Sequence, residues 1–491
     1  MDSKKLTQTK RQKKRRQRRK IAKWRKYKRH LRAIMVILAF VYVLIGLFFE
    51  GHYFVHSSIN GISASAETAL NMQRKIIERL EEYELSIVAE GEKVERLDAD
   101  ELGINKDISL EYLESMLREQ NGLLWGYYLI VGKQYMCDDF ISCDMSKVQR
   151  KVDGLACVEN KNPIKAKSAT VKYSKGKFEA VEEVYGTEVD LEQLSQEICK
   201  KVRTLTTELD LRRDGCYRQP TYTSDCAEMK ELLEVLNRYL DTEITYTIGH
   251  KREMISRDII GSWLYGNDVC QPEFDEDAMI TFVSEMSKKY DTFGRNKHIQ
   301  TRYGVDVTVP GGNYGWLIDK DKEIAQLKKD IVTGDVITRD FTYRYSAASH
   351  GKNDYGRSYI EINKTAQRLF LIMDGEVVLE TPVVTGKANP ECDTPVGAYR
   401  ITYCERNATL RGDDYVTPVS FWMPFCGNIG LHDATWQAAF GGTRYLDGYG
   451  SHGCVNLPLS AAETIYSYVS TGFPVLIYDL PGTETTDEHT Q

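Results

Sequence analysis

The sequence predicts a multidomain chain with a single N-terminal transmembrane helix, an α+β middle region and a mainly β C-terminal domain. Three observations lead to this fold class. A charge-free apolar run follows a basic N-terminus, helical and strand-like patterns alternate from about residue 100 to 345, and strand and hairpin signals dominate the last third. A chain of 491 residues is also too long for one ordinary core and should form about three folded units.

The N-terminus consists of a basic tail followed by an apolar run. Residues 1–32 hold 17 of the 65 Lys and Arg residues and one of the 71 acidic residues, so the rest of the chain carries a net charge of −22. Residues 33–49 contain no charge, and such a 17-residue run is at the short end of what can span a bilayer as a helix. Because the basic cluster precedes this run, the positive-inside rule predicts a cytoplasmic tail and an extracellular remainder.

Two other interpretations of the N-terminus are weaker. A secretory signal would carry a small-residue cleavage site just after its apolar run, and His52–Val55 does not resemble one. A buried core helix beside a nucleic-acid-binding tail would need residues to cover it, and nothing else in the first 60 residues could do so. We therefore expect a retained membrane anchor and no nucleic-acid partner.

Residues 50–99 are expected to form a stalk between the membrane and the first folded domain. Strong helix formers combine with apolar residues between positions 60 and 90, which is typical of a helix leaving the membrane. The alternative is that this helix packs into the first domain.

The middle region, residues 100–345, is expected to contain two α+β halves. A weak repeat supports this, because Tyr185–Asp190 and Tyr314–Asp319 share the pattern Tyr-Gly-x-x-[Val/Ile]-Asp before an amphipathic helix. Asp190 and Asp319 are then the expected N-caps of those two helices.

The last third is expected to be a mainly β domain at residues 358–479, preceded by a polar linker at 346–357. Asp374–Gly375 lies between two strand-like segments and is a strong hairpin signal, because a type I′ turn needs positive φ at both central residues. Pro474–Tyr478 is predicted to be a final buried strand. Residues 480–491 are expected to form a disordered tail.

The cysteine content leaves the disulfides open. Eleven cysteines are compatible with five bridges and one free thiol, or with no bridge at all. Cys216 and Cys226 flank a polar stretch and could close a loop, although a chain of this size does not need such cross-links.

The most specific chemical signal lies near the C-terminus. His432 and Asp433 are followed, after a spacer, by the motif Ser451-His452-Gly453-Cys454-Val455-Asn456. Nucleophilic acyl transfer needs a thiolate, a base within reach, a group that orients the base, and donors for the oxyanion. Cys454 is the candidate nucleophile and His432 the candidate base. Glycine at position 453 leaves room for the backbone N–H groups of Gly453 and Cys454 to face an oxyanion.

This arrangement resembles the catalytic domain of the L,D-transpeptidases, in which a His and a spacer precede Ser/Thr-His-Gly-Cys-x-Asn or Arg. The resemblance covers about Tyr359 to Tyr478 and includes Thr394–Gly397 and Met423–Phe425. The region upstream looks like the peptidoglycan-binding domains of some family members, with Gly311–Trp316 as its most distinctive stretch. The spacer here is slightly longer than is usual in the family, which predicts inserted residues in the flap between His432 and the Cys motif.

The resemblance implies a peptidoglycan L,D-transpeptidase of cell wall synthesis that uses no cofactor and no metal. Its substrates would be a donor tetrapeptide stem and an acceptor amine, joined as a 3→3 cross-link through a thioester on Cys454. His432 would take the thiol proton and later serve the amine. The family holds this histidine with a backbone carbonyl or a small polar group, so Asp433 would act through its backbone, and the role of its carboxylate is left open. His452 is the second candidate base and is better suited to orienting the turn, which Ser451 would brace.

The candidate substrate-binding residues are aromatic side chains of the cleft and one amide. They are Tyr403, Phe425, Trp436 and Asn456, with Trp422 as a further possible cleft wall. For each aromatic a place in the core is the more frequent outcome, as for most large apolar side chains.

Three other functions use the same residues. Water in place of the acceptor amine gives an L,D-carboxypeptidase, and loss of activity gives a wall-binding scaffold. An intact nucleophile, base and glycine-bearing turn argue against the scaffold. A metal site of His432, Asp433, His452 and Cys454 lacks a short paired ligand spacing and ranks well below thiol catalysis.

Overall fold

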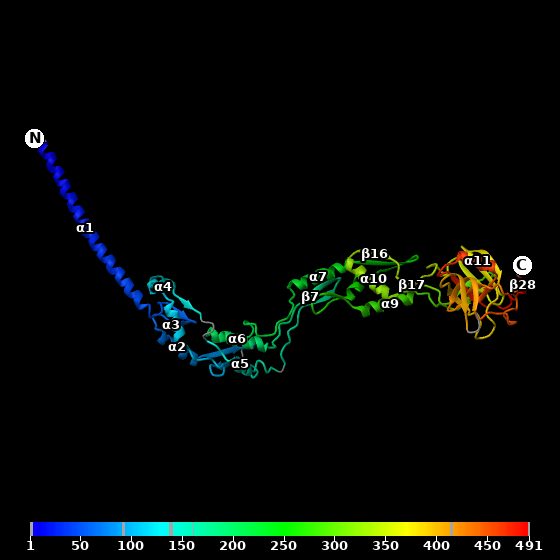
Figure 1. Ribbon diagram of the computed structural model, residues 1–491, viewed down its shortest axis with the longest axis horizontal. Coiled ribbons are helices and arrows are strands. Elements are labelled where there is room, and N and C mark those ends of the chain that lie inside the picture. Colours follow the sequence, from blue (N-terminus) through cyan, green and yellow to red (C-terminus); the bar gives the residue numbers. More distant parts are fainter. Residues whose placement is uncertain (1–2, 91–93, 137–140, 161, 413–415, 490–491) are drawn as a thin grey trace. The chain divides into compact units, whose positions relative to one another are not determined.

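The fold is taken from a computed structural model that describes residues 3–90, 94–136, 141–160, 162–412 and 416–489 (Figure 1). The chain divides into two compact units. Unit 1 comprises residues 1–169 and 182–223, and unit 2 comprises residues 170–181 and 224–491. The region predicted at residues 100–345 is therefore divided between the units, and its two halves do not form one domain.

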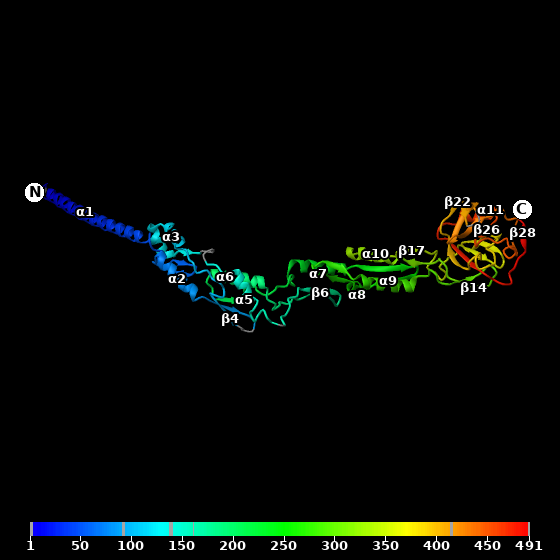
Figure 2. The same ribbon diagram turned by 60° about the horizontal axis from the view of Figure 1, so that its bottom comes forward.

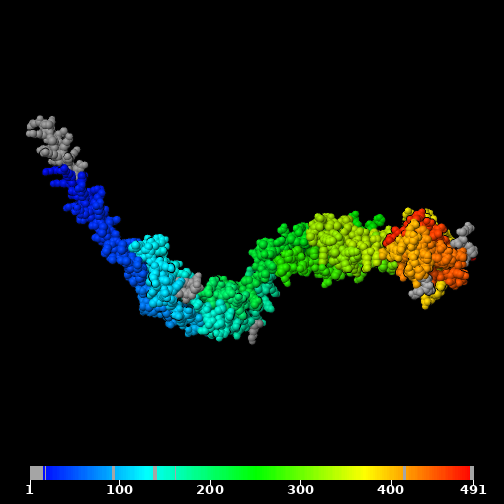
Figure 3. All heavy atoms as spheres, in the orientation of Figure 1, coloured from blue at the N-terminus to red at the C-terminus, as the bar shows by residue number. Residues whose placement is uncertain are grey.

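The N-terminal helix α1 extends from Ser3 to Phe48. Its part from Arg18 to Phe48 is long and apolar enough to cross a membrane. Leu38 is 59% exposed and Phe40 is 64% exposed, and most of α1 stands clear of the rest of unit 1 in Figure 3. The prediction of an N-terminal apolar helix is confirmed.

Most of the other elements of unit 1 surround one hydrophobic core, from which η1 and α4 stand apart, and the sheets of the unit have the strand orders β2-β1-β5 and β4-β3-β8. These elements are β1 (Ser58–Ile59), β2 (Ile62–Ser63), α2 (Ala69–Glu81), β3 (Glu84–Val88), β4 (Val94–Asp98), α3 (Leu110–Arg118), η1 (Gly122–Leu124), α4 (Trp125–Val131), β5 (Gln134–Tyr135), α5 (Met145–Val152), α6 (Leu191–Arg203) and β8 (Glu208–Asp210).

The expectation that residues 50–99 form a stalk is wrong. Helix α2 buries Met72, Ile76 and Leu80 in the core of unit 1, and β3 and β4 follow it in the same core. The apolar positions of α2 recur at helical spacing, so they form a face that needs a partner, and the neighbouring elements supply it. The alternative of packing into the first domain is the correct one.

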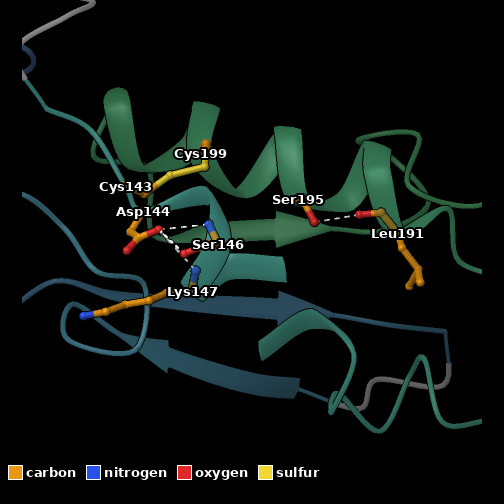
Figure 4. The surroundings of a disulfide bond; sticks show 7 residues. All are labelled: Cys143, Asp144, Ser146, Lys147, Leu191, Ser195 and Cys199. Atoms are coloured by element: carbon orange, nitrogen blue, oxygen red, sulfur yellow. Dashed lines mark hydrogen bonds between the residues drawn. A yellow bond between two sulfur atoms is a disulfide. The ribbon is translucent and has the colours of Figure 1, made fainter. Parts of the chain in front are cut away.

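A disulfide links the start of α5 to α6. Cys143 and Cys199 are joined (Figure 4). Cys216 and Cys226, the pair considered from the sequence, are both free thiols. Asp144, next to the disulfide, caps α5 by accepting the backbone N–H groups of Ser146 and Lys147 (Figure 4). The paired cysteines are 56 residues apart, so no local pattern indicated them.

The first part of unit 2 contains the sheet β10-β9-β16 and the helices α7, α9 and α10. Its elements are β6 (Thr170–Ser174), β7 (Lys177–Val181), α7 (Ala227–Tyr239), β9 (Glu243–Ile248), β10 (Lys251–Ile255), α8 (Arg257–Ser262), β11 (Leu264–Gly266), β12 (Pro272–Phe274), α9 (Glu276–Tyr290), β13 (Lys297–Gln300), β14 (Asp306–Val309), β15 (Leu317–Ile318), α10 (Lys320–Thr333), β16 (Val336–Arg339) and β17 (Tyr343–Tyr345).

The two repeated Asp residues cap helices as predicted. The side chain of Asp190 accepts the backbone N–H of Gln193 at the start of α6, and that of Asp319 accepts the N–H of Lys322 at the start of α10. The weak repeat therefore marks two helix starts, one in each unit.

Two larger sheets of the C-terminal domain, ordered β20-β19-β18-β27-β21 and β22-β23-β24-β26, share one core with α11, and β25 pairs with β28 beside them (Figure 2). Its elements are β18 (Tyr359–Asn363), β19 (Arg368–Met373), β20 (Glu376–Pro382), β21 (Gly397–Arg400), β22 (Glu405–Arg411), β23 (Val416–Cys426), β24 (Ile429–Asp433), β25 (Ala439–Gly441), β26 (Val455–Leu457), α11 (Leu459–Tyr468), β27 (Pro474–Tyr478) and β28 (Asp487–His489).

The local signals in this domain are confirmed. Asp374 and Gly375 have φ values of 50° and 89° and connect β19 to β20, as a type I′ hairpin requires. Strand β27 matches the predicted range Pro474–Tyr478, and all five of its residues are buried. The mainly β character predicted for the last third of the chain is therefore correct.

The segments expected on either side of this domain are ordered by packing. In the expected linker, Tyr355 is buried and Asp354 forms an ion pair with Lys297 at 2.6 Å. In the expected disordered tail, β28 pairs antiparallel with β25. Both expectations are corrected, because polar composition alone does not reveal partners that lie far away in the sequence.

The Gly311–Trp316 segment packs directly on the C-terminal domain. Asn313 donates its amide N–H to the carbonyl of Phe425 at 2.6 Å and accepts the N–H of Arg400 at 2.9 Å. Tyr314 is fully buried in a cluster that includes Ala398 of β21. This stretch therefore anchors the upstream part of unit 2 to the C-terminal domain.

We predict that loss of the Cys143–Cys199 disulfide destabilises unit 1. A closed loop of about this size stabilises a fold by ~4 kcal/mol in the chain-entropy account. Cys199→Ser should therefore lower the thermal unfolding midpoint of unit 1, measured by circular dichroism of the full chain in detergent. Cys392→Ser, at a free cysteine of unit 2, is the control, and equal midpoints in the two variants would contradict the prediction.

Candidate active site

Parallel pairing of β24 with β26 brings the main candidate residues together. His432 in β24 is the register partner of Asn456 in β26, and Cys454 immediately precedes β26. Register partners in a sheet project to the same face, so the His432 and Asn456 side chains lie on one side of the sheet.

A cavity of about 450 Å³ opens beside these side chains. The structure brings together at this cavity six of the residues singled out from the sequence, namely His432, Trp436, Ser451, His452, Cys454 and Asn456. The other lining residues are Leu410, Thr417, Gln437, Ala438, Arg444, Tyr449 and Gly450. The cavity therefore holds the candidate nucleophile together with both candidate bases.

Cys454 is almost completely buried, with 9% of its surface exposed. Its Sγ lies 3.7 Å from the carbonyl oxygen of Asn428, and the backbone N–H of Gly430 donates to the sulfur. Burial raises the pKa of the Cys454 thiol to about 11, although the Gly430 N–H partly opposes this by favouring the thiolate. The thiol is therefore protonated at neutral pH and needs a base before it can attack.

His432 is buried next to two indole rings. Its ring centroid is 5.9 Å from those of Trp422 and Trp436, and burial holds the pKa of the imidazole below its ordinary value. Nδ1 lies 2.9 Å from the backbone carbonyl oxygen of Asp433. Because a carbonyl oxygen can only accept, Nδ1 carries the proton of the neutral ring and Nε2 is the acceptor. This is the tautomer that a general base requires.

Asp433 acts on this site through its backbone. Its side chain Oδ1 accepts the N–H of Phe421 at 2.8 Å, so the carboxylate is used to join β24 to β23. The carboxylate therefore contributes to the sheet, and the backbone carbonyl orients His432.

Two hydroxyl groups hold the turn that carries Cys454. Ser451 Oγ donates to the carbonyl of Cys454 at 2.6 Å and accepts the N–H of Gly453 at 3.0 Å. Thr394 Oγ1 donates to the carbonyl of Gly453 at 2.8 Å and accepts the N–H of Gly386 at 2.9 Å. Gly453 has a φ of 117°, which only glycine adopts readily.

The expected oxyanion role of the Gly453 N–H needs correction. This N–H already donates to Ser451 Oγ, so in this conformation it belongs to the turn. Thr394 was noticed in the sequence only as part of a longer motif, and its role in holding the turn depends on a contact 59 residues away.

The four aromatic residues predicted as cleft walls lie in different places. Trp436 lines the cavity and is 52% exposed, and Trp422 is buried next to His432. Phe425 does not reach the cavity: it is fully buried in the core, three positions after Trp422 on β23, where the strand presents its opposite face. Tyr403 lies outside the cavity lining and accepts the indole N–H of Trp422 at 3.2 Å.

Asn456 and His452 approach the cavity differently. Asn456 is 3% exposed, and its Oδ1 has no hydrogen-bond donor among the described residues. His452 is exposed at the cavity lining. The buried amide oxygen of Asn456 is therefore an acceptor that a bound molecule could satisfy.

Sequence reasoning gave no role to the side chains of three polar residues in the flap between His432 and Ser451. Gln437 donates its amide N–H to the carbonyl of Tyr449 at 2.9 Å and accepts from Arg444 Nη2 at 3.1 Å. The Arg444 guanidinium also lies 4.2 Å from the centre of the Tyr449 ring. Their only sequence signal was their position inside the lengthened spacer.

The metal site considered from the sequence is not formed. Within the described residues, no group of three or more His, Cys, Asp or Glu side chains is arranged to hold a metal ion. His432, Asp433, His452 and Cys454 thus do not make up a ligand set.

Two family models match this chain. The L,D-transpeptidase catalytic domain matches residues 357–477, and a peptidoglycan binding domain matches residues 222–337. No curated protein matches the chain significantly. The mainly β domain with its buried Cys–His cavity is thereby defined as an L,D-transpeptidase catalytic domain.

Solved L,D-transpeptidases are similar to this chain. The Ldtfm-avibactam carbamoyl enzyme is 33% identical over 51% of this chain and 98% of that chain, with a TM-score of 0.40. A Cys-to-Ser mutant of Enterococcus faecium L,D-transpeptidase is 32% identical over 50% of this chain and 100% of that chain, with a TM-score of 0.40. The catalytic domain of E. faecium L,D-transpeptidase is 39% identical over 25% of this chain and 96% of that chain, with a TM-score of 0.23. The chain belongs to the L,D-transpeptidase family.

We predict that Cys454 is alkylated slowly at neutral pH. Only the thiolate reacts, so the raised pKa should make the rate increase about tenfold per pH unit up to pH ~11. Iodoacetamide labelling with peptide mass mapping isolates this thiol from the other cysteines, and glutathione serves as the reference thiol. A Cys454 rate that levels off near pH ~8.5, the ordinary thiol value, would contradict the prediction.

Proposed function

We propose that this chain is a peptidoglycan L,D-transpeptidase that forms 3→3 cross-links through a thioester on Cys454. The observation that carries the proposal is a neutral His432, oriented through Nδ1, that lines the same cavity as the thiol. Membership of the family supplies the reaction class, and the peptidoglycan binding domain match at residues 222–337 supports the polymer as substrate.

The first half-reaction acylates the enzyme. Cys454 Sγ attacks the carbonyl carbon of the third residue of a donor tetrapeptide stem, while His432 Nε2 accepts the thiol proton. The C–N bond to the terminal D-Ala then breaks, and His432 returns the proton to the leaving amine. The products are a thioester on Cys454 and free D-Ala.

The second half-reaction transfers the acyl group. The amine of an acceptor stem attacks the thioester carbonyl, and His432 Nε2 takes the proton that the amine loses. The C–S bond breaks and the departing sulfur recovers this proton, so the resting thiol is restored. Attack by water would follow the same steps and release a tripeptide, which is the L,D-carboxypeptidase reaction.

Backbone and side-chain groups near the sulfur suit the other requirements of this chemistry. Since the Gly453 N–H is engaged by Ser451, the N–H of Cys454 itself is the donor that we assign to the oxyanion. Asn456 Oδ1 is the acceptor that we assign to a stem-peptide N–H, and Trp436 is the exposed apolar wall. His452 and Ser451 are assigned to the turn.

We also propose that α1 anchors the enzyme in the cell membrane, with its N-terminus in the cytoplasm and the catalytic domain outside, facing the cell wall. The apolar part of α1 and the basic residues before it support this orientation. A substrate in the wall requires a catalytic domain on that side of the membrane.

We predict that Cys454 carries the acyl group. The E. faecium catalytic domain is acylated by ertapenem, and we expect the same class of drug to add its mass to this chain on Cys454. Cys454→Ala should abolish the adduct and Cys404→Ala, a free cysteine of the same domain, should keep it. An adduct on the Cys454→Ala protein would refute the nucleophile assignment.

Incubation of the purified chain with a disaccharide-tetrapeptide then identifies the reaction by mass spectrometry. A dimer with loss of one D-Ala is expected for the transpeptidase. A tripeptide product alone would indicate the carboxypeptidase, and no product from a protein with a reactive Cys454 thiol would favour the wall-binding scaffold.

We predict that His432 is the base and His452 is not. His432→Ala should slow single-turnover acylation by roughly 10²–10⁴-fold, the range for loss of a general base, and His452→Ala should slow it less. Unfolding midpoints of both variants control for structure. If His452→Ala were the more damaging at unchanged stability, the two roles would have to be exchanged.

We predict that protease added to intact cells removes the catalytic domain and spares the basic tail. The positive-inside orientation exposes everything after α1 and shields residues 1–32. Antibodies to tags at the two ends measure the outcome, and lysed cells, in which both ends are cleaved, provide the control. Cleavage of the N-terminal tag alone in intact cells would overturn the orientation.

A further inference from the structure

A second apolar element of unit 1 is exposed beside α1. We call η1 and α4 together, residues 122–131, the interfacial segment. It lies in a 13-residue stretch, 120–132, that contains no charged residue, and none of the seven residues of α4 is buried. Its exposed side chains are Leu123 (49%), Leu124 (48%), Tyr127 (59%), Leu129 (43%), Ile130 (86%) and Val131 (62%). Such a continuous apolar surface needs a partner.

The interfacial segment packs against the last turns of α1 (Figure 1). Tyr42 Oη donates to the carbonyl of Leu123 at 2.7 Å, and the indole N–H of Trp125 donates to the carbonyl of Tyr42 at 3.0 Å. The backbones approach closely at Gly46 and Gly122, where a Cβ on Gly122 would lie 2.1 Å from the Gly46 carbonyl oxygen. Close approach through small residues is typical of helices that associate within a bilayer.

These contacts fix the depth of the interfacial segment relative to α1. Tyr42 lies six residues before Phe48, the last residue of α1, which corresponds to about 9 Å along the helix axis. If the apolar run of α1 spans the membrane, Leu123 and Trp125 lie about 9 Å inside the apolar layer. Lipid is then the only solvent available to the exposed side chains that follow them.

We propose that the interfacial segment inserts into the outer leaflet of the membrane beside α1, so that its exposed apolar side chains contact lipid acyl chains. The inference rests on the proposed membrane span, and it adds a second membrane contact made by the folded part of unit 1. The segment is too short to span a bilayer, and its exposure rules out a core helix, which leaves a re-entrant or interfacial position.

The polar groups at this contact suit an apolar environment. The Tyr42 hydroxyl and the Trp125 indole N–H both find acceptors within the protein, as lipid-embedded polar groups must. Lys133, the first charge after the segment, lies 4.6 Å from the centre of the Tyr135 ring. An aromatic and basic border of this kind is common where a membrane protein meets the headgroup layer.

Gln120 ties the segment to the end of α1. Its amide N–H groups donate to the carbonyls of Phe49 and His52 at 2.6 and 2.8 Å, and Tyr135 Oη donates to its Oε1 at 3.1 Å. Gln120 is 6% exposed. These bonds join the end of the membrane helix to the folded part of unit 1, so the domain and the segment approach the bilayer together.

The test is photo-crosslinking of the full chain to lipid. A diazirine-bearing amino acid is placed at Ile130, at Leu38 in α1, or at Met254, which is 70% exposed in unit 2 and serves as the matched control. Each variant is reconstituted in vesicles of phosphatidylethanolamine and phosphatidylglycerol, irradiated and analysed for lipid adducts by mass spectrometry. We expect at least about tenfold more adduct at Ile130 than at Met254. Transfer of a large apolar side chain from water into lipid favours the lipid-buried state by at least about this factor.

The outcomes separate this inference from the membrane span itself. The lipid contact is overturned, and the membrane span is left intact, if Leu38 forms lipid adducts while Ile130 forms no more than Met254. The same result with the photoreactive group at Val131 is required for this conclusion. A crosslink from Ile130 to a second chain also overturns it, in favour of a dimer interface. Absence of adducts at Leu38 as well overturns the membrane span, and the present inference with it.

Discussion

Parallel pairing of β24 with β26 is the constraint on which the catalytic domain depends. It places His432 next to Asn456 and positions Cys454 at the entrance of β26. Parallel neighbours cannot be joined by a tight turn, so the chain needs a long connection between them. That connection, residues 434–454, contributes Trp436, Gln437, Arg444 and Tyr449 to the cavity wall. The flap is thus a consequence of the same parallel pairing that brings His432 and Cys454 to one cavity.

The electrostatics of the cavity favour an uncharged resting site. Burial raises the pKa of the Cys454 thiol and lowers that of His432, so both groups are neutral, whereas a buried ion pair would carry a large desolvation cost. A backbone carbonyl orients His432, and the carboxylate of Asp433 is committed to β23. The imidazolium formed during the proposed reaction would be favoured by the Asp433 carbonyl and by the nearby Asp433 charge and opposed by burial, which dominates and favours return of the proton to the leaving amine.

Sequence patterns predicted the features that depend on neighbouring residues. The Asp374–Gly375 turn, the Asp190 and Asp319 caps and strand β27 each follow from a few adjacent positions. The Cys143–Cys199 bridge was missed, and the choice between a stalk and packing for α2 was made wrongly, because the partners lie in distant segments. Phe425 was misplaced because the face on which a side chain lies depends on the register of β23. The residues of the motif around Cys454 lie together because their spacing encodes one tight turn, which Ser451 and Thr394 hold.

The unsatisfied oxygen of Asn456 is an argument about binding as well as about stability. A buried acceptor without a donor destabilises a fold by about 1–3 kcal/mol, and no donor among the described residues relieves it. The oxygen lines the cavity beside the register partner of Asn456, His432, so a ligand held there can supply the missing N–H. A stem peptide offers such groups along its backbone, whatever its side chains are. In the proposed reaction this contact would fix the position of the scissile carbonyl relative to Cys454. A hydrogen bond from one stem-peptide N–H to Asn456 Oδ1 orients the stem backbone, and the scissile carbonyl belongs to that same backbone.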